Sequence, residues 1–192
     1  MSNNNISNVV SGGYCVGCGA CAYNNPDAQM AKDKYGLLIP VFNTSNSKAA
    51  DAVCPFSSNI NEDKLGVDLY SESNPHHEKR IGYYQNLYAG HVQVDGYRER
   101  GSSGGMVSWI VEELLNRGLI DGAIHVGNSD SDNGIFGYKI SHSISEMRSN
   151  AKSKYYPTSF NQVLEIVSND KKKYAFIGIP CYIKAARLLC LE

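Results

Sequence analysis

The chain has 192 residues, with 18 Lys and Arg against 19 Asp and Glu, and its formal net charge is −1. This length allows one hydrophobic core, or a small module beside a larger domain. Because the net charge is close to zero, the chain lacks the positive field typical of proteins that bind nucleic acids or anionic membranes. No apolar run approaches the roughly 20 residues that span a bilayer, and the N-terminus lacks the basic and apolar segments of a secretory signal. The sequence therefore predicts a soluble, cytoplasmic protein with no nucleic-acid partner and no membrane span.

The first part of the chain, residues 1–62, holds four of the six cysteines. Three of them, Cys15, Cys18 and Cys21, have the C-x2-C-x2-C spacing with which bacterial ferredoxins bind iron–sulfur clusters. In a complete ferredoxin run a fourth cysteine precedes a proline, but here Asn25 stands in that place. Without a secretory signal, three cysteines this close together indicate metal binding rather than disulfides.

The fourth cysteine is found in the remains of a second copy of the motif. Cys54 precedes a proline, and the same spacing counted backwards reaches Thr44, Ser47 and Ala50. In two-cluster ferredoxins the last cysteine of each run binds the cluster of the other run, so the two losses are complementary. They remove one cluster and leave four thiolates for the other. The predicted ligands of this one 4Fe-4S cluster are Cys15, Cys18, Cys21 and Cys54.

Two other interpretations of these cysteines stay open. Four thiolates also satisfy tetrahedral zinc, although structural zinc sites usually pair two C-x2-C units. Free, buried cysteines without any metal are the second alternative. The iron–sulfur cluster is favoured because of the ferredoxin spacing and because Gly17 and Gly19 suit a backbone that wraps a cluster and offers N–H groups to its sulfur atoms.

The second part of the chain follows a polar stretch that is predicted as a linker over residues 63–80. Apolar patterns predict strands over residues 87–94, 123–126, 135–140 and 174–179. A helix with an apolar stripe is predicted from near Met106 to Gly118. Capping boxes begin two short helices, at Ser143 with Glu146 and at Ser159 with Gln162, and a last helix follows residue 179 with Tyr182, Ala185 and Cys190 on its apolar face.

Alternating strands and helices indicate layers of helices on a sheet. The predicted fold class is therefore α+β or α/β. It consists of a small ferredoxin-like 4Fe-4S module over residues 1–62, the linker over 63–80, and an α/β domain over 81–192 with a mostly parallel sheet.

Several segments, taken in order, resemble the beta-subunit family of coenzyme F420 hydrogenases and dehydrogenases. They are the cysteine module, "DKYGLLIPV", "CPF", "YAGHV", "RERGSSGGMVSWIVEELLNRGLIDGAI" and "YAFIGIPCYIKAARLL". The resemblance implies an oxidoreductase that passes electrons between a 4Fe-4S cluster, a bound FAD and a hydride carrier, such as a deazaflavin, together with other oxidoreductase subunits. Relatives extend beyond the point where this sequence ends, so the α/β domain is expected to be truncated.

The loop "RERGSSGG" precedes the helix near Met106, where free backbone N–H groups and the helix dipole favour an anion. Arg98 and Arg100 add positive charge. The resemblance implies that this loop contacts the flavin or its pyrophosphate, while a flexible surface loop is the structural alternative. The residues of the loop assigned to the flavin are Arg100, Ser102, Ser103, Gly104 and Gly105.

Two further segments are candidates for the flavin site. The segment "SKYYPTS" resembles a family segment near the flavin, so Lys154 could neutralise a phosphate and Tyr155 could stack on the ring. Its alternative is a turn before a helix. Cys181 begins the last helix, where a thiolate is favoured, and it is either a pocket or redox-active thiol or an ordinary buried cysteine. Cys190, on the apolar stripe, is expected to be core.

Two other functions are consistent with parts of the pattern. Gly101, Ser103 and Gly105 spell G-x-S-x-G, the nucleophile motif of serine hydrolases, for which His125 or His142 could be the base. That motif needs a strand ending at the serine, which "DGYRER" separates from the predicted strand, and His125 suits a hydrogen-bonded core residue. The other alternative is a ferredoxin-like electron carrier or interaction module without its own flavin. No catalytic residue is assigned.

Overall fold

The computed structural model describes residues 5–44, 47–57, 61–129 and 134–192. Its helices are α1 (Ile6–Ser11), α2 (Ala20–Asn24), α3 (Lys48–Val53), α4 (Glu62–Tyr70), α5 (Tyr97–Arg100), α6 (Met106–Asn116), α7 (Ile144–Ser149), α8 (Asn161–Val167) and α9 (Pro180–Leu189), with a 3-10 turn η1 (Ser71–Ser73). Its strands are β1 (Ala28–Lys32), β2 (Leu38–Phe42), β3 (His76–Glu78), β4 (Gly82–Tyr84), β5 (Gly122–Asn128), β6 (Phe136–Ser141) and β7 (Tyr174–Phe176). The fold is mixed α+β with small sheets.

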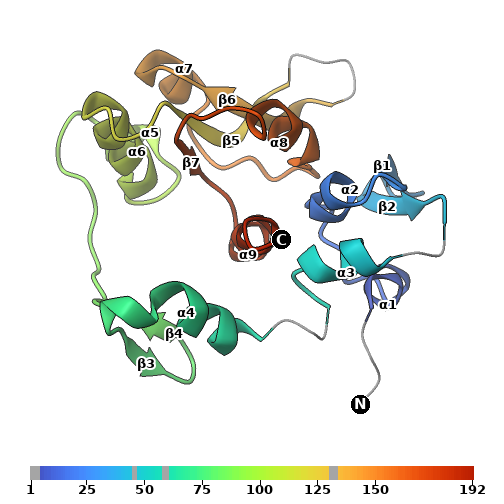
Figure 1. The fold of residues 1–192 in the computed structure, drawn as a ribbon. Helices are drawn as coiled ribbons and strands as arrows, with labels where there is room; N and C mark the ends of the chain where they lie inside the picture. Colours follow the sequence, from blue (N-terminus) through green and yellow to red (C-terminus); the bar gives the residue numbers. More distant parts are fainter. Residues whose placement is uncertain (1–4, 45–46, 58–60, 130–133) are drawn as a thin grey trace.

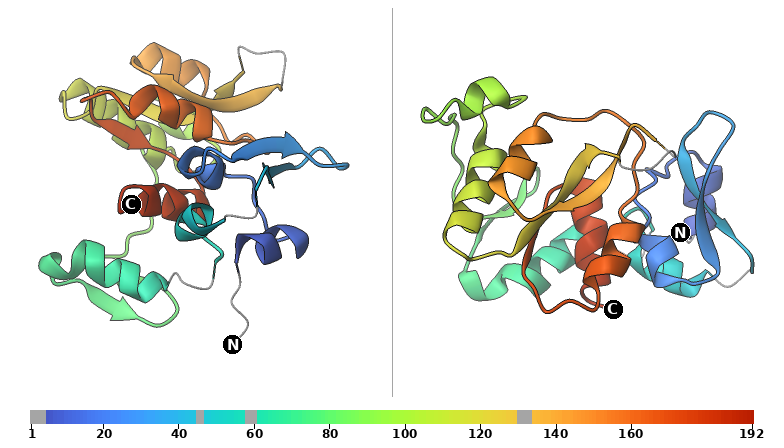
Figure 2. Two further views of the ribbon diagram at one scale, coloured as in Figure 1. Left: turned by 45° about the vertical axis from the view of Figure 1, so that its right-hand side comes forward. Right: turned by 90° about the horizontal axis from the view of Figure 1, so that it is seen from above.

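Helix α9 lies at the centre of the molecule (Figure 1). The cysteine-bearing segment with α1 to α3, β1 and β2 lies on one side of it, and α4 with the β3–β4 hairpin lies below it. The sheet formed by β5, β6 and β7, with α5 to α8, lies above. The other views show the same arrangement (Figure 2). Because α9 contacts α2 and α3, the C-terminal helix supports the cysteine-bearing segment directly.

The three-stranded sheet differs from the mostly parallel sheet that the sequence predicts. Its strand order is β6-β5-β7, and β5 pairs antiparallel with β6 and parallel with β7. The connection from β5 to β6 is short, so it can join only antiparallel neighbours. The connection from β6 to β7 contains α7 and α8, which is long enough to bring β7 parallel to β5.

The predicted strand over residues 87–94 is wrong. In the part of the chain that the structure describes, no strand pairs with these residues, and the side chains of Leu87, Tyr88 and Val94 are exposed. The N–H of Val92 donates to the carbonyl oxygen of Gly104 instead, at 2.9 Å. This segment therefore belongs to the loop that leads into α5 and α6.

Helix α6 is confirmed, and so is its end near Gly118, which has a left-handed φ of 63°. Its predicted apolar stripe is only partly buried. Val111 is buried against Ala123 and Met147, whereas Val107 and Ile110 are exposed. The helix thus packs by one narrow face on the sheet and on α7.

Several local predictions about the second part differ in detail. The capping box of Ser143 forms, since its Oγ accepts from the N–H of Glu146 at 3.3 Å. The box of Ser159 does not form, because its hydroxyl donates to Asn161 Oδ1 at 2.6 Å and α8 begins one residue later without a side-chain cap. Cys190, expected in the core, is exposed. Strand β7 ends at Phe176, before the predicted end at residue 179.

One core cluster contains residues from both predicted domains. Its buried members are Cys18, Ala20, Val53, Phe160, Tyr182, Ala185 and Leu188. Phe160 is fully buried, and its ring lies 5.3 Å from that of Phe176 and 5.8 Å from that of Tyr182. Its N–H also donates to the carbonyl oxygen of Cys18 at 3.0 Å. The division of the chain into domains stays a prediction, but the two parts share this core.

The residues predicted as a linker, 63–80, form most of α4, then η1 and β3. Strand β3 pairs antiparallel with β4 over three positions. Within the part of the chain that the structure describes, no helix combines the length and the apolar character needed to cross a membrane.

Candidate metal centre

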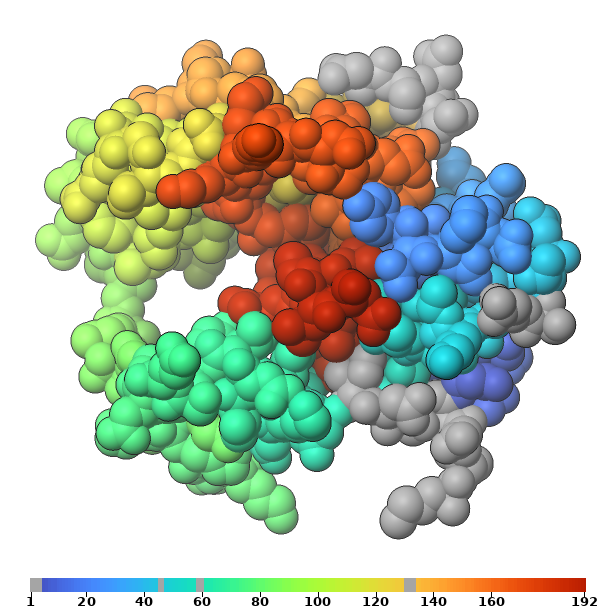
Figure 3. Space-filling model, in the orientation of Figure 1, coloured from blue at the N-terminus to red at the C-terminus, as the bar shows by residue number. Residues whose placement is uncertain are grey.

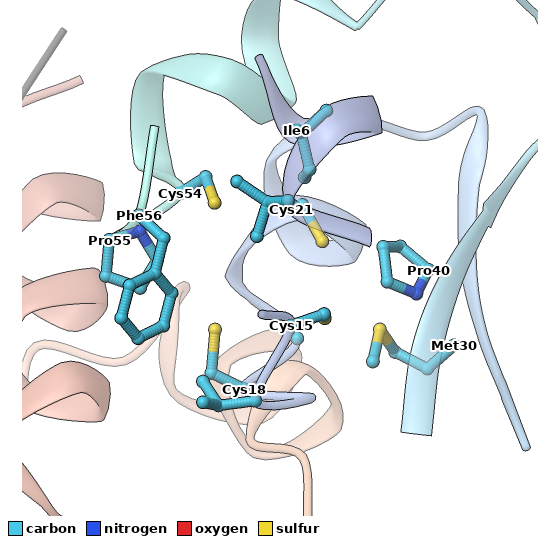
Figure 4. Close-up of a pocket in the computed structure, with 12 residues that line it drawn as sticks. Ile6, Cys15, Cys18, Cys21, Met30, Pro40, Cys54, Pro55 and Phe56 are labelled. Atoms are coloured by element: carbon cyan, nitrogen blue, oxygen red, sulfur yellow. The ribbon is translucent and has the colours of Figure 1, made fainter. Parts of the chain in front are cut away.

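Four cysteines line one pocket between the first three helices and the β1–β2 hairpin (Figure 4). Cys15 and Cys18 lie on the loop before α2, Cys21 lies in the first turn of α2, and Cys54 directly follows α3. Figure 4 shows their side chains around a common space, with Pro55 and Phe56 on one side of it. The structure thus brings together the four residues that the motif and its decayed repeat assign to one cluster, while their role as ligands stays a prediction.

Two glycines let the loop that carries Cys15 and Cys18 pack closely against its neighbours. Gly17 and Gly19 have left-handed φ values of 71° and 87°. A β-carbon on Gly17 would lie 2.7 Å from the carbonyl oxygen of Leu38, and one on Gly19 would lie 2.0 Å from Ser159 Oγ. The loop therefore packs so closely on β2 and on the residues before α8 that side chains at these two positions do not fit.

We expect Gly19→Ala to lower the free energy of unfolding by about 2 kcal/mol, because alanine is strained at this φ and the Ser159 hydroxyl must leave its hydrogen bond. Gly13 is a matched control, since it also has a positive φ but a β-carbon there meets no atom within 4 Å. Gly13→Ala should therefore cost only about 1 kcal/mol, for the backbone alone. Urea unfolding of both variants measures the difference, and equal losses would contradict the close contact at Gly19.

Backbone N–H groups beside all four cysteines act to lower the pKa of their thiols. The pairs are Gly17 with Cys15, Ala20 with Cys18, Ala22 with Cys21, and both Phe56 and Ser57 with Cys54. Such hydrogen bonds stabilise negative charge on sulfur and tune the potential of iron–sulfur clusters. Burial has the larger effect on the thiols and raises the pKa of Cys18 and Cys21 to about 12. A metal must therefore displace protons from these thiols when it binds.

The donor set fits a 4Fe-4S cluster in its chemistry. Four thiolates supply one terminal ligand to each iron of a cubane. Because each thiolate then binds a different iron, the sulfur atoms need only surround a shared space. Among the described residues, no group of three or more His, Cys, Asp or Glu side chains is arranged to hold a single metal ion.

Asn25, which replaces the ferredoxin cysteine, has a structural contact of its own. It is buried, and its Oδ1 accepts from the N–H of Asp27 at 3.0 Å, which shapes the turn between α2 and β1. It does not line the cysteine pocket. This arrangement is compatible with the view that Asn25 marks the position of a lost cluster.

The loop assigned to the flavin lies next to the second assigned segment. The N–H of Ser153 donates to Ser102 Oγ at 2.7 Å, so the loop before α6 contacts the residues around Lys154. Gly105 has a φ of 76°, and a β-carbon there would lie 2.7 Å from the carbonyl oxygen of Tyr97. Ser103 is exposed, and the carbonyl oxygen of Gly104 accepts a hydrogen bond from the N–H of Val92.

Three residues assigned to the flavin, Lys154, Tyr155 and Arg100, contact protein groups or solvent in the structure. The Lys154 ammonium donates to three backbone carbonyl oxygens, the closest of them that of Ala151 at 2.6 Å, and burial lowers the pKa of Lys154. The side chain of Tyr155 is 96% exposed. The Arg100 guanidinium lies over the ring of Tyr97, and its Nη2 is buried without a hydrogen-bond partner. Arg100 therefore has a buried donor that no hydrogen bond among the described residues uses.

Cys181 lies apart from this loop. It lines a second cavity, beside Pro55 and Phe56 and close to Lys184 and Arg187 of α9. The residues assigned to the flavin thus fall in two places, the N-terminal side of α6 and the N-terminal part of α9. Sequence reasoning missed Phe56, Lys184 and Arg187, since nothing in their spacing shows that α9 meets the segment after Cys54.

An ion pair with one buried partner, behind the loop before α6, was also not expected. Glu112 of α6 is 2% exposed, and its carboxylate accepts from the Tyr97 hydroxyl at 2.8 Å and from Arg148 Nη2 at 2.7 Å. The hydrogen bond to Glu112 raises the pKa of Arg148, which is fixed as a cation. These contacts join α5, α6 and α7 on the far side of the loop. The only signal in the sequence is a glutamate directly beside the apolar stripe of α6.

We expect Tyr97→Phe to lower the free energy of unfolding by about 1.5 kcal/mol, because the buried Glu112 carboxylate loses a hydrogen bond. The isosteric control is Tyr155→Phe, which removes a hydroxyl from an exposed side chain and should change stability by less than about 0.5 kcal/mol. Denaturant unfolding of the two variants measures both effects. Equal stabilities would show that the hydroxyl of Tyr97 contributes nothing to this network.

Among the residues that the structure describes, both candidate bases of a serine hydrolase bond to groups other than Ser103. His125 is buried and its Nε2 shares a hydrogen bond with Ser141 Oγ at 2.8 Å, which confirms it as a hydrogen-bonded core residue. Burial lowers the pKa of His125. His142 Nδ1 interacts with the carbonyl oxygen of Asp121 at 3.0 Å. Both imidazoles that the sequence offers as bases therefore engage other groups than Ser103.

Comparison with known proteins agrees with the resemblance seen in the sequence. A model of the family described as "Coenzyme F420 hydrogenase/dehydrogenase, beta subunit N-term" matches residues 87–165. Over 188 residues, 96% of the chain, the sequence is 24% identical to a coenzyme F420-dependent sulfite reductase of Methanocaldococcus jannaschii. The chain spans about a quarter (26%) of the length of that relative.

The family match covers the loop before α6, α6 itself, β5, β6, α7 and the start of α8, while the cysteine pocket lies outside it. The match to the sulfite reductase extends over nearly the whole chain, including the region of the cysteines. Residues 87–165 are therefore similar to the N-terminal part of the coenzyme F420 hydrogenase/dehydrogenase beta subunit.

Proposed function

We propose that the chain is the electron-transferring part of an iron–sulfur flavoprotein oxidoreductase. In this proposal one 4Fe-4S cluster and FAD pass electrons to or from a hydride carrier such as coenzyme F420. The observation that carries the proposal is the pocket in which Cys54 meets Cys15, Cys18 and Cys21. The family match over residues 87–165 and the printed name of the sulfite reductase support F420 as the carrier.

The protein would hold and shield the cluster with groups that the structure shows. The four cysteines bind it, and the N–H groups beside each sulfur stabilise the thiolates. Tyr182 of α9 fixes the loop, since its hydroxyl lies 2.9 Å from the carbonyl oxygen of Val16 and 2.8 Å from that of Thr158. When bound, the cluster supplies single-electron transfer and the flavin couples it to hydride transfer.

The partners and the location follow from the same proposal. A deazaflavin or a ferredoxin serves as the redox carrier, and further oxidoreductase subunits complete the enzyme. We place this enzyme in the cytoplasm, without nucleic acid as a partner. These statements rest on the family resemblance and on the sequence.

A second candidate function is an electron-carrier module that binds the cluster but no flavin of its own. One observation favours it. The residues assigned to the flavin do not form one site, because Cys181 lies away from the Ser102 loop and Tyr155 points into solvent. On this alternative the α/β part is a scaffold for the cysteine-bearing segment.

Anaerobic purification with iron, acid-labile sulfide, zinc and released flavin measured on one sample tests both candidates. About four iron and four sulfide per chain together with FAD are expected for the proposed function. Iron and sulfide without flavin would favour the electron-carrier module. Zinc alone, persisting after attempted reconstitution of the cluster, would rule out both redox functions.

A further inference from the structure

Helix α1 lies over one side of the cysteine pocket. Its Ile6 and Val9 are 2% and 3% exposed, and both line the pocket together with the four cysteines. In Figure 4, Ile6 lies beside Cys21, on the side of the pocket from which Cys54 comes. In the space-filling view α1, in dark blue, lies at the edge of the molecule next to the cyan segment that contains α3 (Figure 3). Ser7, on the other face of α1, is exposed, so α1 separates this side of the pocket from solvent.

The cysteines of the pocket are divided between two core clusters. Cys21 and Cys54 belong to the cluster that contains Ile6 and Val9 of α1. Cys18 belongs to the other cluster, with Phe160 and residues of α9. Helix α1 therefore covers the thiols of Cys21 and Cys54, whereas the thiol of Cys18 is covered from elsewhere.

A carboxylate of α3 holds α1 in this position. The N–H of Ile6, the first residue of α1, donates to Asp51 Oδ1 at 2.6 Å. The Ser47 hydroxyl donates to Asp51 Oδ2 at 3.0 Å and fixes the carboxylate from the start of its own helix. A negative charge in this place also suits the positive end of the α1 dipole. Because Asp51 lies three residues before Cys54, its hydrogen bonds tie α1 to the segment that supplies the fourth thiol.

The residues that hold α1 come from the decayed second copy of the cysteine motif. Ser47 and Ala50 stand at two positions where the spacing counted back from Cys54 places the cysteines of a second cluster. In the structure Ala50 is fully buried in the same core cluster as Ile6, and Ser47 bonds to the carboxylate of Asp51. Positions of the lost cluster thus pack against α1 or help to hold it.

We infer that α1 is a cover for the proposed cluster, and that Asp51 is the positioning residue that keeps this cover closed. The inference deepens the proposed function and rests on it. The closed cover keeps water and oxygen away from the side of the cluster that Cys21 and Cys54 bind. Because the reduced cluster carries one more negative charge, the apolar side chains of the cover also lower its reduction potential.

Alkylation of the thiols by iodoacetamide, in the full chain before any cluster is inserted, tests the cover itself. Ile6→Ala removes most of the side chain that lies over the pocket, so Cys21 and Cys54 should react about ten times faster than in the unchanged chain. Cys18 should react at its original rate, because it belongs to the other core cluster. Peptide mass spectrometry measures each cysteine separately. Unchanged rates at Cys21 and Cys54, or equal acceleration of all three thiols, would overturn the inference.

The matched control for this variant is Ile124→Ala. Ile124 is 3% exposed in β5 and does not line the pocket, so the control removes the same atoms from an equally buried position. It should lower the stability of the chain but leave the ratio of the rates at Cys21 and Cys18 unchanged. If Ile124→Ala raised this ratio as much as Ile6→Ala does, α1 would not be a specific cover.

Asp51→Ala tests the positioning residue. Loss of the hydrogen bond to the N–H of Ile6 should let α1 open more often, and Cys21 should react about five times faster. The rate is measured at Cys21 because the charge of Asp51 itself raises the pKa of Cys54. An unchanged rate at Cys21 would show that Asp51 does not keep the cover closed.

Asp170→Ala is the matched control for Asp51→Ala. Asp170 accepts from a backbone N–H and a hydroxyl, as Asp51 does, since its partners are the N–H of Lys172 at 3.0 Å and the hydroxyl of Tyr174 at 2.8 Å. It does not line the cysteine pocket. The control should leave the rate at Cys21 unchanged, and equal acceleration by both variants would contradict a specific role of Asp51.

The same variants after anaerobic reconstitution separate the inference from the proposed function. The visible absorption of the cluster should disappear in air about ten times faster in Ile6→Ala than in Ile124→Ala, and its reduction potential should be higher. A cluster with the same lifetime and potential in both variants overturns the inference alone. Selective exposure of Cys21 and Cys54 in a chain that binds only zinc supports the cover over the thiols and overturns the redox function.

Discussion

We expect Cys54→Ser to abolish the proposed 4Fe-4S cluster, whereas Asn25→Ala should leave it in place. Cys54 lines the pocket with the other three cysteines, and without its thiolate one iron of a cubane has no protein ligand. Asn25 lies outside the pocket and makes a turn with Asp27. Replacing Asn25 should lower the free energy of unfolding by about 1 kcal/mol, because this hydrogen bond is lost. It removes no ligand of the proposed cluster.

Iron and sulfide per chain after anaerobic reconstitution measure this result. The control is Cys190→Ser, since Cys190 is an exposed cysteine outside the pocket and its loss should leave the iron content unchanged. The opposite outcome, a cluster that survives in Cys54→Ser and is lost in Asn25→Ala, would show that the two halves of the motif are not complementary remains of a repeat. Loss of the cluster in both variants would mean that the turn at Asn25 is needed to form the pocket.

The largest effect on stability is expected for Phe160→Ala, which should lower the free energy of unfolding by about 3–5 kcal/mol. Phe160 is fully buried, and its ring contacts the rings of Tyr138, Phe176 and Tyr182. Because Cys18 belongs to the same core cluster, the cavity left by this variant also loosens the cysteine loop. The variant should therefore take up less iron than the unchanged chain.

Urea unfolding measures the stability of this variant, and iron content after reconstitution measures the effect on the pocket. Phe160→Leu is the conservative control, since leucine fills most of the space and should cost less than about 1.5 kcal/mol. If Phe160→Ala were destabilised but took up as much iron as Phe160→Leu, the shared core would not support the cysteine loop. A loss below about 1 kcal/mol would contradict the position of Phe160 at the centre of this core.

The cysteine pocket shows how far a sequence can predict a site. The spacing of Cys15, Cys18 and Cys21 is local, and the Cys-Pro end at Cys54 links a second segment to it through the logic of the ferredoxin repeat. Both signals depend only on which residues stand at which intervals. The sequence therefore predicts which cysteines meet, and their assembly at one pocket follows that prediction.

Two predictions of local structure, a strand and a helix cap, were wrong. Residues 87–94 have the alternation of a strand, but a strand also needs a neighbour, and the N–H of Val92 finds the carbonyl oxygen of Gly104 instead. Ser159 has the spacing of a capping box, yet its hydroxyl bonds to Asn161, close to the cysteine loop. At Val92 a hydrogen bond to a distant loop replaces the predicted strand pairing, and at Ser159 a different local hydrogen bond replaces the predicted cap.

The sequence by itself predicted which four cysteines line one pocket, helices α6 and α7, strands β5 and β6, and the resemblance that the family match over residues 87–165 agrees with, because each depends on local spacing or on ordered segments. Only the tertiary structure decided that Phe160 packs beside Cys18 and that Phe56 meets α9 across a cavity. Those residues lie more than a hundred positions apart, and their side chains carry no spacing signal that relates them. Burial of apolar surface brings them together, and it acts on the folded chain as a whole.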